Sequence, residues 1–258
     1  MRIRATVAAL SGALALSALV LPSAQADTQA LPVVSNVTIN SGKSVVVGTT
    51  VAKTFTVSLT ASHASGIEDA FVHLWHGTNA DTDVDGLLLP NEDAATCTAS
   101  SATTSTCKLT ITAVPGEDLY ANALAGGWHV TAAVVAGDGE LYWNDEYKTH
   151  KVQRASKLTV NASPEPIAKG KTLTVTGKLS RASWESLTYK GYGSQSVKLQ
   201  FRKAGTTTYS TVKTITSNSY GDLKTTTTAN YDGYWRFRFE GTSTTPAVSA
   251  TGDYVDVQ

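Results

Sequence analysis

Hydrophobic and polar residues alternate with a period of two in many segments of this chain. In KTFTVSLTAS (53–62), Phe, Val and Leu alternate with Thr and Ser, and in GYWRFRFEGT (233–242) Trp and Phe alternate with Arg and Glu. The apolar positions of the expected strands are Phe55, Val57, Leu59, Trp128, Val130, Ala132, Val134, Leu173, Val175, Val197, Leu199, Phe201, Trp235, Phe237 and Phe239. The alternation predicts β-strands with one buried and one solvated face, because a helix would scatter these aromatic residues around its circumference.

Short segments that contain glycine separate the alternating stretches. AGDGE (136–140), KAGTT (203–207) and YDGYW (231–235) combine glycine with polar residues, which is the composition of tight turns. Many strands at this spacing, without a long helical pattern, predict an all-β protein built from β-sandwiches.

A domain boundary is expected where one strand ends near residue 153 and another begins near Lys157. Pro164 and Pro166 follow and restrict the edge of the next sheet, since proline cannot donate a hydrogen bond to a neighbouring strand. We therefore predict two tandem immunoglobulin-like β-sandwich domains, at 32–153 and 154–258.

The N-terminal segment has the pattern of a secretory signal peptide. Two arginines near the start precede a run of small and apolar residues that ends at Leu21, and Ala24-Gln25-Ala26 supplies the small residues that a signal peptidase reads. No later stretch has the uncharged length that a membrane span requires. We predict a signal peptide at 1–26, a mature tail at 27–31, and a secreted, extracellular protein without a transmembrane segment.

The net charge of the chain is zero but differs in sign between its two halves. Residues 27–153 contain five Lys and Arg against 14 Asp and Glu, a net charge of −9, whereas residues 154–258 contain 14 against seven, a net charge of +7. Solvated surfaces and mutual attraction between two domains would explain this division. A basic half that binds an anionic polymer, such as cell wall or polysaccharide, would explain it too.

Two cysteines, Cys97 and Cys107, are the only ones in the chain and lie in TCTASSATTSTC (96–107). In a secreted chain such a pair is expected to be oxidised, here as a bridge across a hairpin or a short loop. Closing so short a loop contributes about 2–3 kcal/mol. A CxxC redox or zinc pattern is absent.

The stretch DTDVDGLLLPNE (81–92) matches every specified position of the calcium loop pattern D-x-[DN]-x-[DN]-G-x₅-E. The predicted ligands are the side chains of Asp81, Asp83, Asp85 and Glu92 and the backbone carbonyl of Leu87. Gly86 would occupy the sharp turn of such a loop. The stretch therefore predicts calcium as a cofactor.

The segments on either side of this stretch lack the helices of an EF-hand. HGTNA (76–80) places Gly, Thr and Asn where a helix should end, and DAATCTASS (93–101) has no large apolar residue to pack. Residues 87–89 are instead predicted to form a short strand that enters the sandwich. Two interpretations stay open: calcium held in a loop between strands, or a polar turn whose aspartates are merely solvated.

No motif for catalysis is present. HExxH, GxSxG and the P-loop lysine motif are all absent, so we predict that the protein is not an enzyme and has no catalytic residues. His73 and His76 lie three residues apart, which places them on opposite faces of a strand and makes them poor partners for zinc. No nucleic-acid-binding module is recognised, so nucleic acid is not expected as a partner.

The stretch SRASWESLTYKGYGSQS (180–196) is predicted to be a long connection between strands, and its aromatic residues form a second candidate site. Trp184, Tyr189 and Tyr192 could stack on the sugar rings of a ligand. Alternatively, the three rings cover the edge of the sandwich or form a contact between the domains.

Three segments carry a resemblance to a known group of proteins. ASKLTVNASPEPIAKGKTLTVTGKL (155–179), VKLQFRKAGTTTYSTVKTI (197–215) and DGYWRFRFEGTSTTPAVSATGDYVDV (232–257) resemble a module of small secreted proteins from Gram-positive actinobacteria. The similarity covers most of the second half and, more loosely, the first. The resemblance implies an extracellular immunoglobulin-like fold of unassigned function, in a group where some members carry a calcium-binding label. It transfers no catalytic residue.

These observations predict a secreted, non-enzymatic binding or structural module. One alternative is a calcium-dependent carbohydrate or cell-wall binding protein that uses 81–92 for the ion and 184–192 for the ligand. Another is an inhibitor or ligand of a secreted hydrolase. The expected partners are accordingly a cell-wall or extracellular polysaccharide or a secreted protein.

Overall fold

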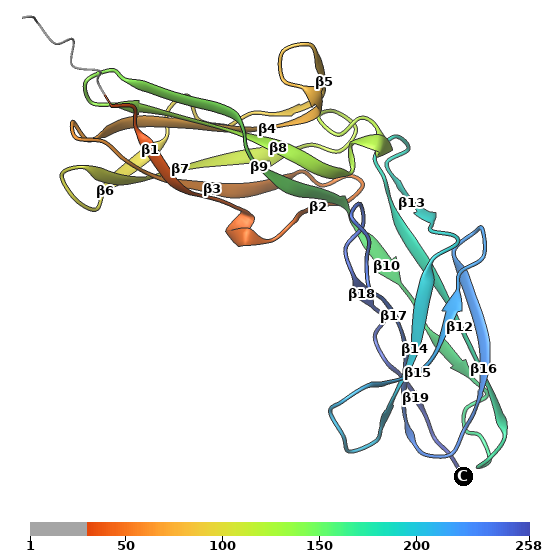
Figure 1. Cartoon of the computed structure of the whole chain (residues 1–258). Helices are drawn as coiled ribbons and strands as arrows, with labels where there is room; N and C mark the ends of the chain where they lie inside the picture. The colour runs from red at the N-terminus through yellow and green to blue at the C-terminus, as the bar shows by residue number, and fades with distance from the viewer. Residues whose placement is uncertain (1–29) are drawn as a thin grey trace, which may run out of the picture.

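The computed structural model describes residues 30–258, so the predicted signal peptide at 1–26 lies outside the described residues. Two β-sandwiches follow one another along the chain and meet end to end at an angle (Figure 1). The helical segments of the described residues are two 3₁₀ turns, so the predicted all-β class is confirmed. No helix in this part of the chain is long and apolar enough to cross a membrane.

The first sandwich packs two sheets face to face. One sheet has the strand order β1-β3-β7-β6 and the other β2-β9-β8-β4-β5. The elements are β1 (Val33–Ile39), η1 (Asn40–Gly42), β2 (Val45–Val47), β3 (Lys53–Ser62), β4 (Ile67–Asn79), β5 (Asp83–Leu88), β6 (Thr96–Ala99), β7 (Thr104–Ala113), η2 (Asn122–Leu124), β8 (Gly126–Ala136) and β9 (Leu141–Arg154). Neighbouring strands are antiparallel except β2, which runs parallel to β9.

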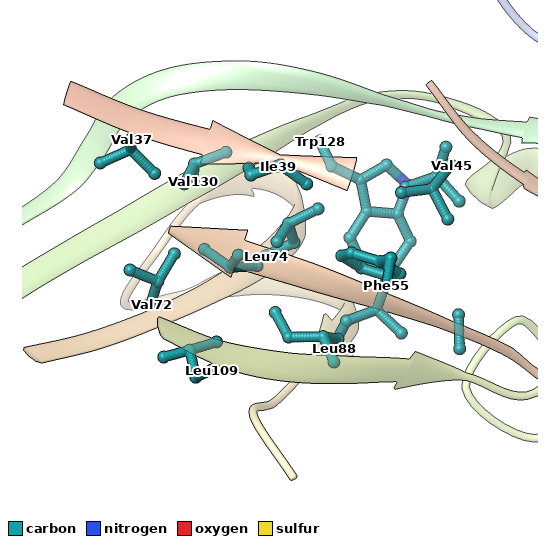
Figure 2. Close-up of a cluster of buried hydrophobic side chains, with 14 of the residues drawn as sticks. Val37, Ile39, Val45, Phe55, Val72, Leu74, Leu88, Leu109, Trp128 and Val130 are labelled. Atoms are coloured by element: carbon teal, nitrogen blue, oxygen red, sulfur yellow. The ribbon is translucent and has the colours of Figure 1, made fainter. Parts of the chain in front are cut away.

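The apolar faces of these two sheets meet in one core, which Figure 2 shows in close-up. Phe55 from β3 and Trp128 and Val130 from β8 lie in this core and are buried. The indole of Trp128 also satisfies its polar atom, since Nε1 donates to the carbonyl of Leu124 at 2.7 Å. Full burial of a large apolar side chain contributes about 1.5–3 kcal/mol, so this core is the main source of stability for the first sandwich.

The second sandwich is built around the long strand β12. Strands β10, β11, β13 and β16 all pair with β12, and the facing sheet has the order β15-β14-β17-β18 with β19 also paired to β17. The strands are β10 (Ser156–Leu158), β11 (Asn161–Ser163), β12 (Thr172–Ser183), β13 (Thr188–Gly191), β14 (Ser196–Lys203), β15 (Ser210–Thr216), β16 (Asp222–Thr228), β17 (Gly233–Phe239), β18 (Val248–Ser249) and β19 (Asp253–Val255). A second cluster of buried side chains fills the space between these sheets.

The predicted buried face of each alternating strand is confirmed in both sandwiches, but the opposite face is not always solvated, since Thr131 and Ala133 of β8 are buried as well. Every apolar position named from the sequence is buried, apart from Phe201, which is half-buried. In β17, Trp235, Phe237 and Phe239 point into the core, while Arg236 and Arg238 lie on the outer face. The buried faces therefore follow from the period-two pattern alone.

The disulfide predicted between Cys97 and Cys107 is confirmed. The two residues lie directly opposite one another on β6 and β7, with their Cα atoms 3.9 Å apart. Cys107 is buried on the same face of β7 as Leu109 and Ile111, as its place in the alternation requires. The bridge therefore fastens the short edge strand β6 to the first sandwich.

Hydrogen bonds join the two sandwiches across a single linking residue, Ala155. The side-chain amide of Gln153 donates to the carbonyl of Thr242 at 3.0 Å, and Nε of Arg154 donates to the carbonyl of Ala182 at 2.6 Å. Burial lowers the pKa of Arg154 to about 10, so its guanidinium is still charged at neutral pH. The junction is thus a packed contact and not a solvated linker.

Trp184 follows β12 of the second sandwich, yet its indole packs in the core of the first. Its exposed fraction is 0%, Nε1 donates to the carbonyl of Val47, and the backbone N–H donates to Oδ1 of Asn122 at 3.0 Å. The ring therefore offers no face to a ligand, contrary to the stacking role considered from the sequence. The alternative interpretation, a contact between the two halves of the chain, describes its place in the structure.

Replacing this side chain, Trp184→Ala, is expected to lower the free energy of unfolding by about 3–5 kcal/mol, because it leaves a cavity and an unpaired carbonyl at the junction. Urea titration of the whole chain measures the loss. Tyr220→Ala, which removes an aromatic ring that is 72% exposed, serves as the control and should change stability by no more than about 0.5 kcal/mol. Equal effects of the two substitutions would contradict the docking role of Trp184.

Candidate functional site

The acidic stretch 81–92 forms a strand, where the calcium pattern predicts a loop. Residues 83–88 make up β5, which pairs with β4 at the edge of its sheet, so Asp83 and Asp85 are strand residues. The shorter strand expected at 87–89 therefore begins earlier than predicted. An extended backbone spreads successive carboxylates apart, whereas an ion-binding loop curls them around one point.

Glycine at position 86 is required by close packing and not by a turn. Its φ is not positive, and a Cβ at this position would lie 2.8 Å from Cη2 of Trp128 and 3.2 Å from Cδ2 of Leu124. The first of these distances is too short for any real side chain, and both neighbours belong to the buried core. The glycine of the calcium pattern is therefore explained by the close approach of β5 to Trp128.

The carboxylates of the stretch have separate partners. Asp85 Oδ1 lies 2.5 Å from Nδ1 of His76, and Asp83 accepts a hydrogen bond from the hydroxyl of Thr78. Beyond β5 the chain crosses to the other sheet, where Pro90 forms a bridge to Ile111.

Glu92 therefore lies against β7 of the opposite sheet. Its two oxygens accept bonds from the N–H and the hydroxyl of Thr110, both at 2.7 Å. These hydrogen bonds lower the pKa of Glu92.

The residues proposed as calcium ligands do not fit a shared ion. Asp81, Asp83, Asp85, Leu87 and Glu92 spread over β5 and both of its flanks, and Glu92 is bonded to another sheet. Among residues 30–258, no group of three or more His, Cys, Asp and Glu could hold a metal. Calcium binding at 81–92 stays a prediction, and the arrangement of the side chains gives it no support.

The calcium prediction is tested by the melting temperature at millimolar calcium relative to a chelator. The separate side-chain partners favour no change, because six to eight oxygens would have to converge on one ion. Calorimetric titration and thermal unfolding measure this directly. A saturable heat of binding that disappears in the Asp83→Asn, Asp85→Asn double variant would contradict the expectation and restore the calcium loop.

A recess of about 440 Å³ opens on the outer face of the sheet that contains β4, β5 and β9. Part of the acidic stretch lines it, but together with residues that are far apart in the sequence. The lining residues are His73, Trp75, Ala80, Asp81, Val84, Leu87, Trp143 and Asp145. None of them is Lys or Arg, so the ionisable side chains of the recess are two carboxylates and one imidazole.

Two aromatic side chains, Trp75 and Trp143, line the recess, and each is stacked on a neighbouring ring. Phe71 and Trp143 both lie opposite Ala133 on the intervening strand β8, and their rings stack at 6.3 Å over this small residue. Trp75 stacks on His129 at 4.1 Å and is almost completely buried. Trp143, by contrast, is 51% exposed, so one face of its indole is available to a ligand.

Asp145 is the best-anchored polar group of the recess. Its Oδ1 accepts hydrogen bonds from Nε1 of Trp143 at 2.8 Å and from the hydroxyl of Thr131 at 3.2 Å. Its backbone carbonyl accepts from Nε1 of Trp75 at 2.8 Å. No hydrogen bond to Oδ2 is formed by the described residues, so this oxygen is available as an acceptor next to the exposed indole.

His73, another lining residue, has one polar atom without a partner among the described residues. Its Nδ1 is buried and has no hydrogen-bond partner within residues 30–258. Burial lowers the pKa of His73, and the nearby carboxylate of Asp145 offsets part of that effect. The imidazole is therefore neutral near pH 7 and can donate or accept one hydrogen bond.

Acidification is expected to destabilise the fold, because burial also lowers the pKa of His150. A histidine with a lowered folded-state pKa binds fewer protons in the folded than in the unfolded state. The free energy of unfolding therefore falls as the pH drops below about 6.5. Urea titrations between about pH 7 and pH 5 measure this slope. The double variant His73→Asn, His150→Asn should flatten it, and an unchanged slope in this variant would contradict the assignment.

The other two aromatic residues of the second candidate site do not form a shared platform with Trp184. The stretch 180–196 is the end of β12 and a hairpin to β13, where a long connection was predicted. Lys157 Nζ lies 3.8 Å above the ring of Tyr189. The ring of Tyr192 packs against Arg181 and Phe239 in the second sandwich.

Sequence reasoning did not find Trp143 and Asp145. The signal for them was a tryptophan two residues before an aspartate in a largely polar stretch, LYWNDEY (141–147). Residues that are two positions apart along a strand point to the same face of the sheet. That pattern alone does not tell which residues of β4 lie beside them, because β8 intervenes.

Comparison with known proteins gives a partial match to one family. A model described as a family of unknown function (DUF5707) matches residues 40–134. This region is less than half of the chain and ends before β9, so it includes His73 and Trp75 but not Trp143 or Asp145. Among curated proteins, none matches the chain.

Several solved structures are similar to the chain at low sequence identity. A marsupial T cell receptor is 12% identical over 87% of this chain and 73% of its own, with a TM-score of 0.31. The D00-D0 domain of intimin is 14% identical over 85% and 99%, with a TM-score of 0.29. Domains A168–A170 of titin are 8% identical over 88% and 68%, with a TM-score of 0.24. Scores this low support no argument about function, and the immunoglobulin-like topology stays a prediction.

Proposed function

We propose that this protein is a secreted, non-enzymatic binding module that takes a carbohydrate ligand in the recess on the first sandwich. The observation that carries the proposal is the half-exposed indole of Trp143 beside the anchored carboxylate of Asp145. A sugar ring has an apolar face of C–H groups and an edge of hydroxyl groups. It therefore matches a site with one aromatic surface and a few fixed hydrogen-bond acceptors.

The polar groups of the recess suit hydroxyl groups in particular. Asp145 Oδ2 is free to accept a hydrogen bond, since the described residues donate only to Oδ1, and the exposed Asp81 also lines the recess. Because Asp145 is held by two donors, it loses little conformational freedom when a ligand binds. Leu87 and Val84 supply apolar surface on the remaining side.

An extracellular location is part of the proposal. The disulfide between Cys97 and Cys107 is characteristic of proteins that fold in an oxidising environment. The signal-peptide pattern of the N-terminal residues points the same way. Division of the chain into two domains at 154 likewise belongs to the proposal, supported by the two separate clusters of buried side chains.

Of the two alternatives considered from the sequence, the carbohydrate binder is retained in altered form. The ligand site moves from residues 184–192 to the recess, and calcium is no longer required for it. An inhibitor or ligand of a secreted hydrolase stays a prediction that no particular side-chain arrangement favours.

The test is a glycan array with the wild-type protein and the variants Trp143→Ala and Trp143→Phe. Loss of the indole should weaken binding at least about tenfold, or about 1.4 kcal/mol, whereas Phe should retain part of the affinity because it keeps an aromatic face. Tyr220→Ala removes an exposed ring from the second sandwich and should bind like the wild type.

Two outcomes would contradict the proposal. The absence of any glycan signal for the wild type would show that the ligand is not a carbohydrate. Equal losses of binding in the Trp143 and Tyr220 variants would show that the recess is not the binding site. Because two carboxylates line the recess, the bound glycan should also be recovered and checked for intact chain length. Cleavage of the glycan would refute the proposal that the protein is not an enzyme.

A further inference from the structure

Arginine and tyrosine side chains stack on one another over the outer face of the β14–β17 sheet in the second sandwich. This face is opposite to the core-facing side of β17 and belongs to the basic half of the chain. Arg202 lies opposite Tyr234 in the strand register, and Arg236 lies opposite Gln200. The two arginines are thus diagonal neighbours on adjacent strands, with Cα atoms on the order of 7–8 Å apart.

Both guanidinium groups are fixed in place by neighbouring rings and hydrogen bonds. The Cζ atom of Arg202 lies 4.0 Å from the ring centre of Tyr234, and that of Arg236 lies 3.7 Å from the ring centre of Tyr209. Arg236 Nε also donates to Oε1 of Gln200 at 2.9 Å, and Arg202 Nη1 donates to the carbonyl of Thr206. Each group donates one hydrogen bond to a described residue, which leaves four of its five N–H groups without an acceptor among residues 30–258.

Neither arginine has a carboxylate partner among residues 30–258. The next outward-facing arginine of β17 differs in this respect, since Arg238 and Lys198 both pair with Glu240 at 3.0 Å. Those contacts lower the pKa of Glu240 to about 2. One carboxylate thus compensates part of the charge of Arg238 and Lys198, whereas Arg202 and Arg236 have no such partner among residues 30–258.

Asp232, Asp253 and Asp256 all form hydrogen bonds with other groups. Asp253 on β19 accepts a hydrogen bond from the N–H of Ala162, and Asp232 accepts one from the N–H of Val257. Tyr254, which is 41% exposed, lies beside Tyr234 with ring centres 5.1 Å apart and extends the aromatic surface. The face thus combines two unneutralised guanidinium groups with a partly exposed aromatic border.

We propose that Arg202 and Arg236 form a binding site for a phosphate monoester group of an extracellular ligand. A guanidinium presents parallel N–H donors that match two oxygens of a phosphate. A phosphate monoester carries a charge of about −1.5 to −2 at pH 7, which balances two guanidinium groups, whereas a sulfate ester carries about one charge. The site lies on the second sandwich, so it is independent of the recess proposed for carbohydrate.

Stacking on tyrosine alone would also hold the planes of the two arginines, as it does in purely structural ladders. It does not explain why two half-buried guanidinium groups are left without an acid when the adjacent basic pair has one. An unpaired cation that has lost part of its hydration is costly unless an anion arrives. We therefore assign the negative charge that would pair with these two arginines to the ligand.

The test compares phenyl phosphate with phenyl sulfate, which share the ring and differ in the anionic group. The ¹⁵N-labelled protein is titrated with each compound at equal ionic strength, and the Nε–H signals of the arginine side chains are followed. Phenyl phosphate should shift the signals of Arg202 and Arg236 saturably and bind several-fold more tightly than phenyl sulfate. This advantage should disappear near pH 5, where the phosphate ester loses its second charge.

The double variant Arg202→Gln, Arg236→Gln should bind phenyl phosphate at least about tenfold more weakly. Its matched control is Lys171→Gln, Lys224→Gln, which removes the same charge from exposed positions on the β12–β16 side of the sandwich and should bind within about twofold of the wild type. Equal loss in both double variants, or equal binding of phosphate and sulfate by the wild type, would overturn the site. If the arginine variant does not fold, the wild-type comparison still decides.

Discussion

The fit of β5 against Trp128 is the constraint on which the candidate carbohydrate site depends. The buried indole leaves no space for a Cβ at position 86, so β5 approaches the core only because that residue is glycine. With Gly86 turned inward, Leu87 falls on the outer face beside Trp75, to which it is opposed in the strand register. The wall of the recess is therefore set by packing on the other side of the sheet.

This fit also explains how far the sequence predicts the fold and where it misleads. Alternation in β3, β8, β14 and β17 identified the buried faces correctly, because period two is a local property of an extended chain. The calcium pattern at 81–92 is equally local, and it counts positions without knowing the path of the chain. Gly86 is required by close packing against Trp128, and Glu92 accepts a hydrogen bond from Thr110 on another sheet. Neither partner is visible within the twelve residues of the pattern.

Long-range contacts account for the rest of what the sequence could not supply. Trp184 and Val47 are separated by 137 positions, and only the folded chain shows that the indole is buried at the junction. The recess likewise unites Trp75 with Asp145, which are 70 positions apart, across a strand that lies between theirs. Exposure of an aromatic residue is a tertiary property, so Trp184 and Trp143 look alike in the sequence but have opposite environments.

The docking of Trp184 gives the two proposed sites a consequence that neither has alone. A single linking residue and a buried indole hold the sandwiches together, so the recess on one and the arginine pair on the other are presented in a constrained relation. For a polymer that carries both sugar rings and phosphate monoester groups, binding at one site raises the effective concentration at the other. The gain is greatest when the spacing on the polymer matches the fixed spacing on the protein. It falls if the junction loosens, because the second contact must then also order the two sandwiches relative to one another.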